Sequence, residues 1–296
     1  MDMTTTMHPT VSSHAPLAQT SASPVRARFE TRPDAQTMRI AASALGIDHL
    51  IVDRAVANLQ SGRVVAAVFS GKMASGKDTV AEEIAKHLVN HGLPAAVVHR
   101  TSDPIRAELD EAIALIESAA SQDDAVTSLV EKMNLLTPVA QHLVDELYDL
   151  TRTMKINASD RTDLNRHLLQ YLADAGRRAV DPGYWIKQFF ARMVETLANG
   201  SSAFLTGGRY PNEIGPAQSL GMMTIRLDVS RAVQEQRLTG RDGLRPNPEL
   251  LENPNECALD DFVGFNLVIS NEGELHVAVD AAIHELVEHA ARMASR

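Results

Sequence analysis

Residues 64–79 read Val-Val-Ala-Ala-Val-Phe-Ser-Gly-Lys-Met-Ala-Ser-Gly-Lys-Asp-Thr and carry the strongest structural signal in the chain. The first six are apolar and mostly β-branched or small, which predicts a buried strand. After the stretch, apolar residues recur at every fourth position from Val80 to Leu88, a spacing typical of an amphipathic helix. Between them lies Gly71-x-x-x-x-Gly76-Lys77, so the sequence predicts a strand, a glycine-rich loop and a helix in that order.

This loop has the spacing of a phosphate-binding loop, in which backbone N–H groups and a helix N-terminus surround phosphate oxygens. Lys77 is then expected to reach the β- and γ-phosphates of a nucleotide. The next residue is Asp78, where serine or threonine is usual, and Thr79 follows. Because carboxylate oxygens are good Mg²⁺ ligands, Asp78 is the candidate metal ligand. The competing interpretation, a glycine-rich turn that arose by chance, is disfavoured by the flanking strand and helix.

The composition excludes several classes of protein. The chain has 296 residues, is 44% hydrophobic and carries a formal charge of −10, which argues against a protein that coats nucleic acid. The single Cys257 excludes an internal disulfide, and no apolar run approaches the length of a membrane span. The N-terminus lacks the features of a secretory signal. We therefore expect a cytoplasmic protein without a membrane or nucleic-acid polymer as partner.

The chain divides into three segments. Residues 1–35 are rich in Thr, Ser, Ala, Pro and His and predict a disordered tail, whereas residues 36–62 predict a helical extension. From residue 63 to 296 strand-like and helix-like segments alternate, which predicts an α/β domain with a parallel sheet. The strand candidates are 64–69, 95–100, 202–206, 222–228 and 265–270. A long stretch at about 104–200 has helical periodicity and predicts an inserted helical subdomain.

A second candidate site follows the predicted strand at 202–206. Two glycines, Gly207 and Gly208, are followed by Arg209. In an open parallel sheet ligands bind at the carboxyl ends of the strands, and an arginine fork suits a phosphate. Taken alone, Arg209 is more readily interpreted as a solvated arginine in a surface turn, but beside the glycine loop a phosphate contact is favoured.

Three further groups are weaker candidates. In the predicted helix 230–242, Arg237 and Arg241 share one face with Gln234 and could stabilise a transferring phosphoryl group, or simply form a charged surface. In the helical stretch, three polar residues could contact a base or a monophosphate, namely Arg166, Gln170 and Arg178. Taken alone, they are better interpreted as ordinary helix-surface residues. At the end of the last strand, Asn271 could approach an adenine ring or only form a turn.

Taken together, these segments resemble the deoxynucleoside monophosphate kinases encoded by bacteriophages. The family's loop G-x-x-x-S-G-K-D-T matches Gly71–Thr79, including the unusual Asp78. Four more family phrases have counterparts, F-A-D-P-L-K at 101–106, R-x-L-L-Q at 166–170, D-V-R-F-P-N-E at 207–213 and a degenerate H-P-S-E-x-x-L-D at 253–260. The resemblance covers about 64–288. One departure is that Gly207 stands where the family has an aspartate.

The resemblance implies a P-loop kinase fold: a five-stranded parallel sheet, helices on both faces and an inserted substrate subdomain. The implied reaction is phosphoryl transfer from ATP, with Mg²⁺, to a (deoxy)nucleoside monophosphate. ATP would be held by the loop and by Asn271, the loop residues being Gly71, Lys72, Ser75, Gly76, Lys77, Asp78 and Thr79. The acceptor phosphate would be held by Arg209 with Arg106 or Arg178. Asp103 is the candidate to orient the acceptor oxygen.

Two alternatives stay open at this point. One is a kinase for another small acceptor such as dephospho-CoA, whose hydroxyl would require a base and would make Asp103 essential. The other is a nucleotide-binding protein without activity, suggested by Gly207. The sequence leaves open whether the chain is a monomer or a homodimer. A phage origin, and hence the host cytoplasm as the location, follows from the resemblance alone.

Overall fold

The computed structural model describes residues 25–27, 33–159, 162–243 and 247–295. Its centre is a sheet of five parallel strands, and the five strands predicted from the sequence are confirmed: β2 (Ala66–Ser70), β3 (Ala96–Arg100), β4 (Ser202–Gly208), β5 (Met223–Asp228) and β6 (Leu267–Ser270). The strand order is β6-β5-β2-β4-β3, which places β2 and the loop after it in the middle of the sheet.

A sixth strand was not predicted. β1 (Val25–Ala27) pairs antiparallel with β6, with Val25 opposite Ile269. These three residues fall within the segment 1–35 that the sequence predicted to be a disordered tail, and for them that prediction is wrong. A three-residue strand has too few positions to show an alternating pattern, so it left no signal. The parts of the expected tail at 1–24 and 28–32 lie outside the described residues.

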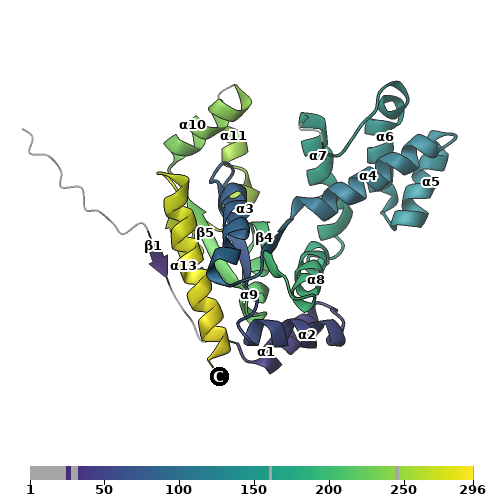
Figure 1. Cartoon of the computed structure of the whole chain (residues 1–296). Coiled ribbons are helices and arrows are strands. Elements are labelled where there is room, and N and C mark those ends of the chain that lie inside the picture. The colour runs from purple at the N-terminus through teal and green to yellow at the C-terminus, as the bar shows by residue number, and fades with distance from the viewer. Residues whose placement is uncertain (1–24, 28–32, 160–161, 244–246, 296) are drawn as a thin grey trace, which may run out of the picture.

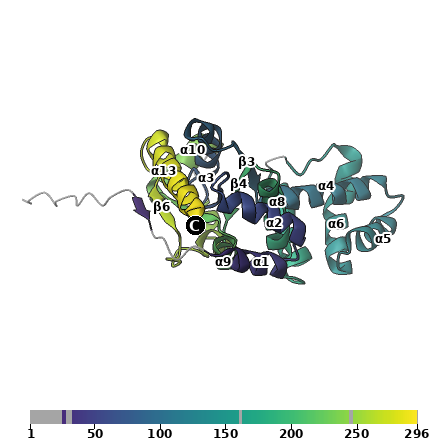
Figure 2. The same cartoon turned by 60° about the horizontal axis from the view of Figure 1, so that its bottom comes forward.

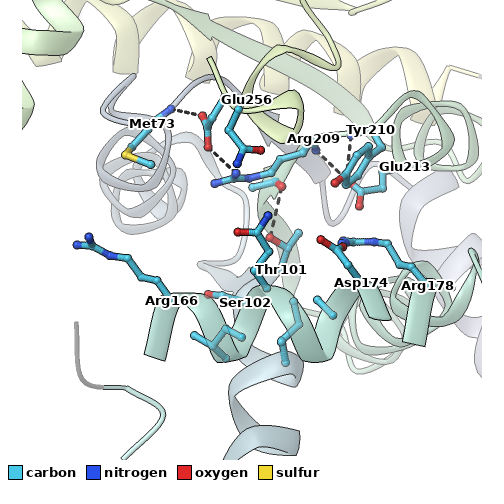
Figure 3. Close-up of a pocket in the computed structure, with 16 residues that line it drawn as sticks. Met73, Thr101, Ser102, Arg166, Asp174, Arg178, Arg209, Tyr210, Glu213 and Glu256 are labelled. Atoms are coloured by element: carbon cyan, nitrogen blue, oxygen red, sulfur yellow. Dashed lines mark hydrogen bonds and ion pairs between the residues drawn. The ribbon is translucent and has the colours of Figure 1, made fainter. Parts of the chain in front are cut away.

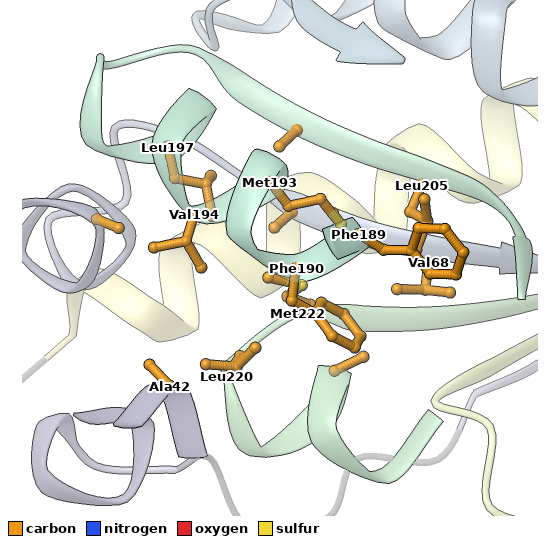
Figure 4. Packing of buried hydrophobic residues seen from close by; sticks show 14 of the residues in the cluster. Ala42, Val68, Phe189, Phe190, Met193, Val194, Leu197, Leu205, Leu220 and Met222 are labelled. Carbon is orange, nitrogen blue, oxygen red and sulfur yellow. The ribbon is translucent and has the colours of Figure 1, made fainter. Parts of the chain in front are cut away.

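Helices cover both faces of the sheet (Figures 1 and 2). One face is covered by α1 (Ala35–Ala44), α2 (His49–Gln60), α8 (Tyr184–Ala198) and α9 (Pro211–Ser219), and the other by α3 (Lys77–His87) and α13 (Leu275–Ala294). Because side chains alternate along a strand, Val68 and Leu205 enter the first core while Phe69 and Phe204 enter the second. Figure 4 shows Val68 and Leu205 against Phe189 and Met193 of α8.

Between β3 and β4 a helical insertion projects from the body (Figure 1). It consists of α4 (Ser102–Ser118), α5 (Gln122–Met133), α6 (Thr137–Thr153), α7 (Asp163–Tyr171) and a π-helix, η2 (Leu172–Arg178). These helices bury a core of their own, which runs from Leu109 to Leu172. The expected limits of 104–200 included α8, but α8 packs on β4 and α2 and belongs to the body.

The remaining elements connect these parts. A short 3₁₀ turn, η1 (Leu88–His91), follows α3, and α10 (Arg231–Asp242) follows β5. Two helices of one turn each, α11 (Pro248–Leu251) and α12 (Pro254–Cys257), precede β6. Across the described ranges, no helix is both long enough and apolar enough to cross a membrane.

An ion-pair network fastens the insertion to the body. Arg177 of η2 donates from Nε to Glu108 of α4 at 2.8 Å and from Nη2 to the carbonyl of Met133 at 2.9 Å. The hydroxyl of Tyr184, in the first turn of α8, also donates to Glu108. Burial and the neighbouring Glu108 raise the pKa of Tyr184 to about 12. The side chains of Arg177 and Glu108 are 10% and 16% exposed, so the pair is largely removed from water.

Replacing Arg177 by methionine should therefore destabilise the protein strongly. The variant leaves Glu108 as a buried carboxylate without its cation, and breaking such a pair costs about 3–5 kcal/mol. The free energy of unfolding in urea measures the effect. The matched control is Arg39→Met, whose pair with Asp53 is about half exposed and should contribute about 1 kcal/mol or less. Equal losses in the two variants would contradict the structural role of Arg177.

Candidate functional site

The loop from Gly71 to Gly76 joins the end of β2 to the first residue of α3, Lys77. Gly76 is the N-cap of α3 and has φ 85°, in the left-handed region. A Cβ atom at Gly76 would lie 2.5 Å from Nδ2 of Asn271, and one at Gly71 would lie 2.6 Å from the carbonyl oxygen of Leu227. Both positions therefore require glycine. The N-cap of α3 has no side-chain hydrogen bond, so the N–H groups of its first turn are not bonded by the N-cap side chain.

The carbonyl groups of this loop are held from one side. Gln234 donates from Nε2 to the carbonyl of Met73 at 2.9 Å. Arg237 donates to the carbonyls of Ala74 and Ser75, each at 3.3 Å, and to that of Asn271 at 2.7 Å. Arg237 thus bonds the loop backbone, and its expected contact with a phosphoryl group stays a prediction.

Asn271 belongs to the same arrangement. Its side chain is buried and donates from Nδ2 to the carbonyl of Ser75 at 2.8 Å, so it too is engaged with the loop. The hydroxyl of Ser75 is buried without a hydrogen-bond partner among the described residues. Lys72, expected at the nucleotide phosphates, instead pairs with Asp260 at 2.6 Å.

A first cavity of about 390 Å³ opens beside the loop and the N-terminus of α3. Its lining brings together many of the residues expected to hold a nucleotide, namely Ala74, Gly76, Lys77, Asp78, Thr79, Arg237, Arg241, Asn271, Gly273 and Leu275. Burial lowers the pKa of Lys77, opposed by Asp78, whose carboxylate lies 3.9 Å from Nζ. An anionic ligand in this cavity would stabilise the charged form of Lys77.

A second cavity, of about 300 Å³, lies between the sheet and the helical insertion (Figure 3). Arg209, directly after β4, lies on one side of the cavity, and Arg166 and Arg178 of the insertion lie on the other. Gln170 of the insertion also lines the cavity. Four residues predicted from separate stretches of sequence are thus brought to one cavity. The rest of the lining consists of Met73, Thr101, Ser102, Ile105, Leu169, Ala173, Asp174, Gly207, Tyr210, Glu213, Asn253 and Glu256.

Two expected residues do not line this cavity. Asp103 accepts a hydrogen bond from the backbone N–H of Arg100 at 3.0 Å, which ties it to the end of β3 at the start of α4. Arg106 donates to the carbonyl of Ala158 inside the insertion, at 3.3 Å. The structure therefore brings Arg178, and not Arg106, to the same cavity as Arg209.

The π-helix η2 explains how Asp174 and Arg178 reach the cavity. The N–H of Ala179 bonds the carbonyl of Asp174, an i+5 bond, and Trp185 donates from Nε1 to the carbonyl of Ala173. Arg178 lies 2.5 Å from the Asp174 carboxylate, and its guanidinium sits over the ring of Tyr210. Such π-turns are frequent at functional sites, and nothing in the sequence pattern predicted this one.

Two buried glutamates were not predicted as site residues. Glu213, in the first turn of α9, accepts the backbone N–H of Arg209 at 2.7 Å and that of Tyr210 at 3.3 Å. Glu256 of α12 accepts the N–H of Met73 at 2.6 Å and pairs through its other oxygen with Arg209. A proline at the start of α9, followed two residues later by an acid, indicates a helix N-terminus, and this pattern could have pointed to Glu213. Glu256 could not be found in this way, because its contacts are with residues distant in sequence.

Gly207 stands where a carboxylate would be expected from the family resemblance. It has φ 94°, and β2 shifts its register here so that Ser70 pairs with Gly208. A Cβ at Gly207 would lie 2.5 Å from Oγ1 of Thr101. An aspartate could not occupy this backbone without rearrangement. Within the described ranges, no cluster of three or more metal-ligating side chains is present.

Comparison with known proteins gives little further information. No protein-family model matches the chain. A 106-residue segment is 29% identical to the "Uncharacterized protein ORF77" of Ictalurid herpesvirus 1 (strain Auburn). The match covers 33% of this chain and 46% of the viral protein, so the chain spans about half the length of this relative.

Glu213 yields a prediction on pH dependence. Burial raises the pKa of its carboxyl above the ordinary 4.5, partly offset by the N–H groups of Arg209 and Tyr210. A folded-state pKa above the unfolded value favours the native state at low pH, and this contribution is lost as the pH rises through the folded value. From pH 4.5 upward, the stability of wild type should therefore fall relative to Glu213→Gln, which keeps an acceptor but does not ionise.

Unfolding free energies of both proteins between pH 4 and pH 8 measure this trend. The control is Glu117→Gln, which removes an exposed carboxyl on α4. A difference between wild type and Glu213→Gln that stays constant with pH would contradict the role of burial.

Proposed function

We propose that this protein transfers the γ-phosphoryl group of ATP to a (deoxy)nucleoside monophosphate. The observation that carries the proposal is that neighbouring residues of the glycine loop line different cavities: Met73 lines the second and Ala74 the first. Two ligands held in these cavities would meet at the loop. The resemblance to phage nucleotide kinases supports the same reaction.

The first cavity fits the triphosphate of the donor. The uncapped N–H groups of α3 favour anionic oxygens, and the buried Lys77 supplies a positive charge where solvent screens it little. Arg237 and Arg241 of α10 also line this cavity and add positive charge. Asp78 and Thr79 offer oxygen ligands for Mg²⁺, which usually binds through one or two protein oxygens and the substrate phosphates. The metal would neutralise charge on the β- and γ-phosphates.

The second cavity fits a phosphate monoester with a base. Arg209 and Arg178 present planar forks for the acceptor phosphate, and Gln170 offers an amide for a base edge. An acceptor phosphate is already anionic and needs no strong base to remove a proton. This agrees with the location of Asp103, which is bound to the end of β3 and does not line the cavity.

In the proposed step, an acceptor phosphate oxygen forms a bond to the γ-phosphorus while the bond from that phosphorus to the bridging β–γ oxygen breaks. The products are a nucleoside diphosphate and ADP. Catalysis would come from positioning and from stabilisation of the charge on the transferring group by Lys77 and the arginines. The helical insertion, which forms one wall of the acceptor cavity, would exclude water.

Product analysis by chromatography tests the proposal. The protein is incubated with ATP, Mg²⁺ and single acceptors from a panel of deoxynucleoside monophosphates, nucleoside monophosphates and dephospho-CoA. Formation of a nucleoside diphosphate is the expected result. Conversion of dephospho-CoA alone would overturn the acceptor assignment, and ATP binding without any product would favour a nucleotide-binding protein without activity.

Lys77→Ala should reduce transfer about 10²–10³-fold or more, because it removes a buried cation aimed at the phosphates. The fold should persist, since alanine is a good helix former at the start of α3. The control is Lys86→Ala on the same helix, whose exposed side chain pairs with Glu83. Steady-state rates and circular dichroism measure the two effects, and wild-type turnover in Lys77→Ala would contradict the assignment of the loop.

A further inference from the structure

We propose that Glu256 is a positioning residue that ties the acceptor arginine, Arg209, to the glycine loop and so fixes the orientation of its guanidinium. The inference rests on the proposed function and goes beyond it, because it assigns a role to α12, a one-turn helix far from the loop in sequence. Among the described residues, Glu256 is the side chain that bonds both the backbone of the loop and the guanidinium of Arg209.

The geometry divides the carboxylate between two partners (Figure 3). Oε2 accepts the N–H of Met73 at 2.6 Å, and Oε1 pairs with Nη1 of Arg209. The Glu256 side chain is only 3% exposed, whereas that of Arg209 is 37% exposed. This contact uses one of the five N–H donors of the arginine, so the rest of the fork can serve an acceptor phosphate.

Met73 of the loop is thereby held through both of its backbone polar groups. Its N–H bonds Glu256, and its carbonyl accepts from Gln234 of α10. Gln234 is one of several groups on the carbonyl side, which also include Arg237 and Asn271. Loss of Glu256 would consequently leave the loop largely in place, while Arg209 would lose the contact that orients its guanidinium.

The local charge supports this assignment. Lys77 interacts electrostatically with both residues of the pair: the positive charge of Arg209 lowers the pKa of Lys77, whereas the negative charge of Glu256 raises it. Glu256 therefore offsets the repulsion between two cations that the reaction needs side by side. A carboxylate buried between a backbone N–H and an arginine has both oxygens bonded, which offsets the cost of its burial.

The test uses Glu256→Gln in the full-length chain. A glutamine of similar shape has one acceptor oxygen and one N–H₂ group, so one of the two oxygens that Met73 and Arg209 use is replaced by a donor. We expect the KM for the nucleoside monophosphate to rise about tenfold while the KM for ATP stays within about twofold. In an Arg209→Met background, Glu256→Gln should raise the KM for the nucleoside monophosphate little further, because the guanidinium that Glu256 orients is already absent.

Glu252→Gln is the matched control, because it removes an exposed charge from the same segment and should leave both KM values unchanged. Two outcomes would overturn the proposal: equal increases of both KM values in Glu256→Gln, or a KM increase in the double variant equal to the product of the increases in the two single variants. Either outcome would indicate general disruption of the site rather than orientation of Arg209.

A second readout needs no catalysis. Urea unfolding of wild type, both single variants and the double variant gives the coupling between the two side chains in the free protein. Non-additive stabilities are expected, and additive stabilities would refute the link. If no acceptor is phosphorylated while coupling is present, the proposed function fails but the link between Glu256 and Arg209 stands.

Discussion

The candidate site depends on the orientation of a few peptide groups in the glycine loop. The N–H and C=O of a peptide group point in opposite directions, so partners that bond the carbonyls of a loop from one side leave its N–H groups facing the other side. Gln234, Arg237 and Asn271 provide these partners from α10 and the end of β6. The left-handed Gly76 lets the backbone approach Asn271 closely enough for this. The sheet matters to the site chiefly because it fixes β6 and α10 beside the end of β2.

The helical insertion has a core of its own and meets the body mainly through α4, η2 and α8. The second cavity lies at this junction, and its two walls therefore come from separately packed parts of the molecule. Arg177 and Arg178 are neighbours in sequence but have different contacts: Arg177 pairs with Glu108 inside the insertion, and Arg178 lines the cavity. Glu108 also accepts a hydrogen bond from Tyr184 of α8, which links this pair to the body.

The sequence predicted those features that depend on local pattern. The five parallel strands and the glycine loop follow from apolar runs and glycine spacing, and the position of Arg209 follows from the rule that strand ends form sites. Arg178 was a candidate through the family resemblance. The contacts that individual side chains make were not predicted. Arg237 shares its helical face with Arg241 as expected, yet three carbonyls engage its guanidinium. Asp103 and Arg106 were assigned by a short phrase, whereas their actual partners are a strand end and residue 158. Glu256 reaches Met73 across 183 positions, which no local pattern could reveal.

The short strand β1 has a consequence for how copies of this chain meet. Unpaired N–H and C=O groups along the margin of a sheet can bond to another molecule and seed ordered aggregates. Val25–Ala27 pairs with β6 and covers that margin, whereas the opposite margin is formed by β3, whose sequence ends in the polar residues His99 and Arg100. Three residues from the N-terminal part of the chain thus occupy the hydrogen-bonding edge of β6, which leaves that edge closed to pairing with a second molecule.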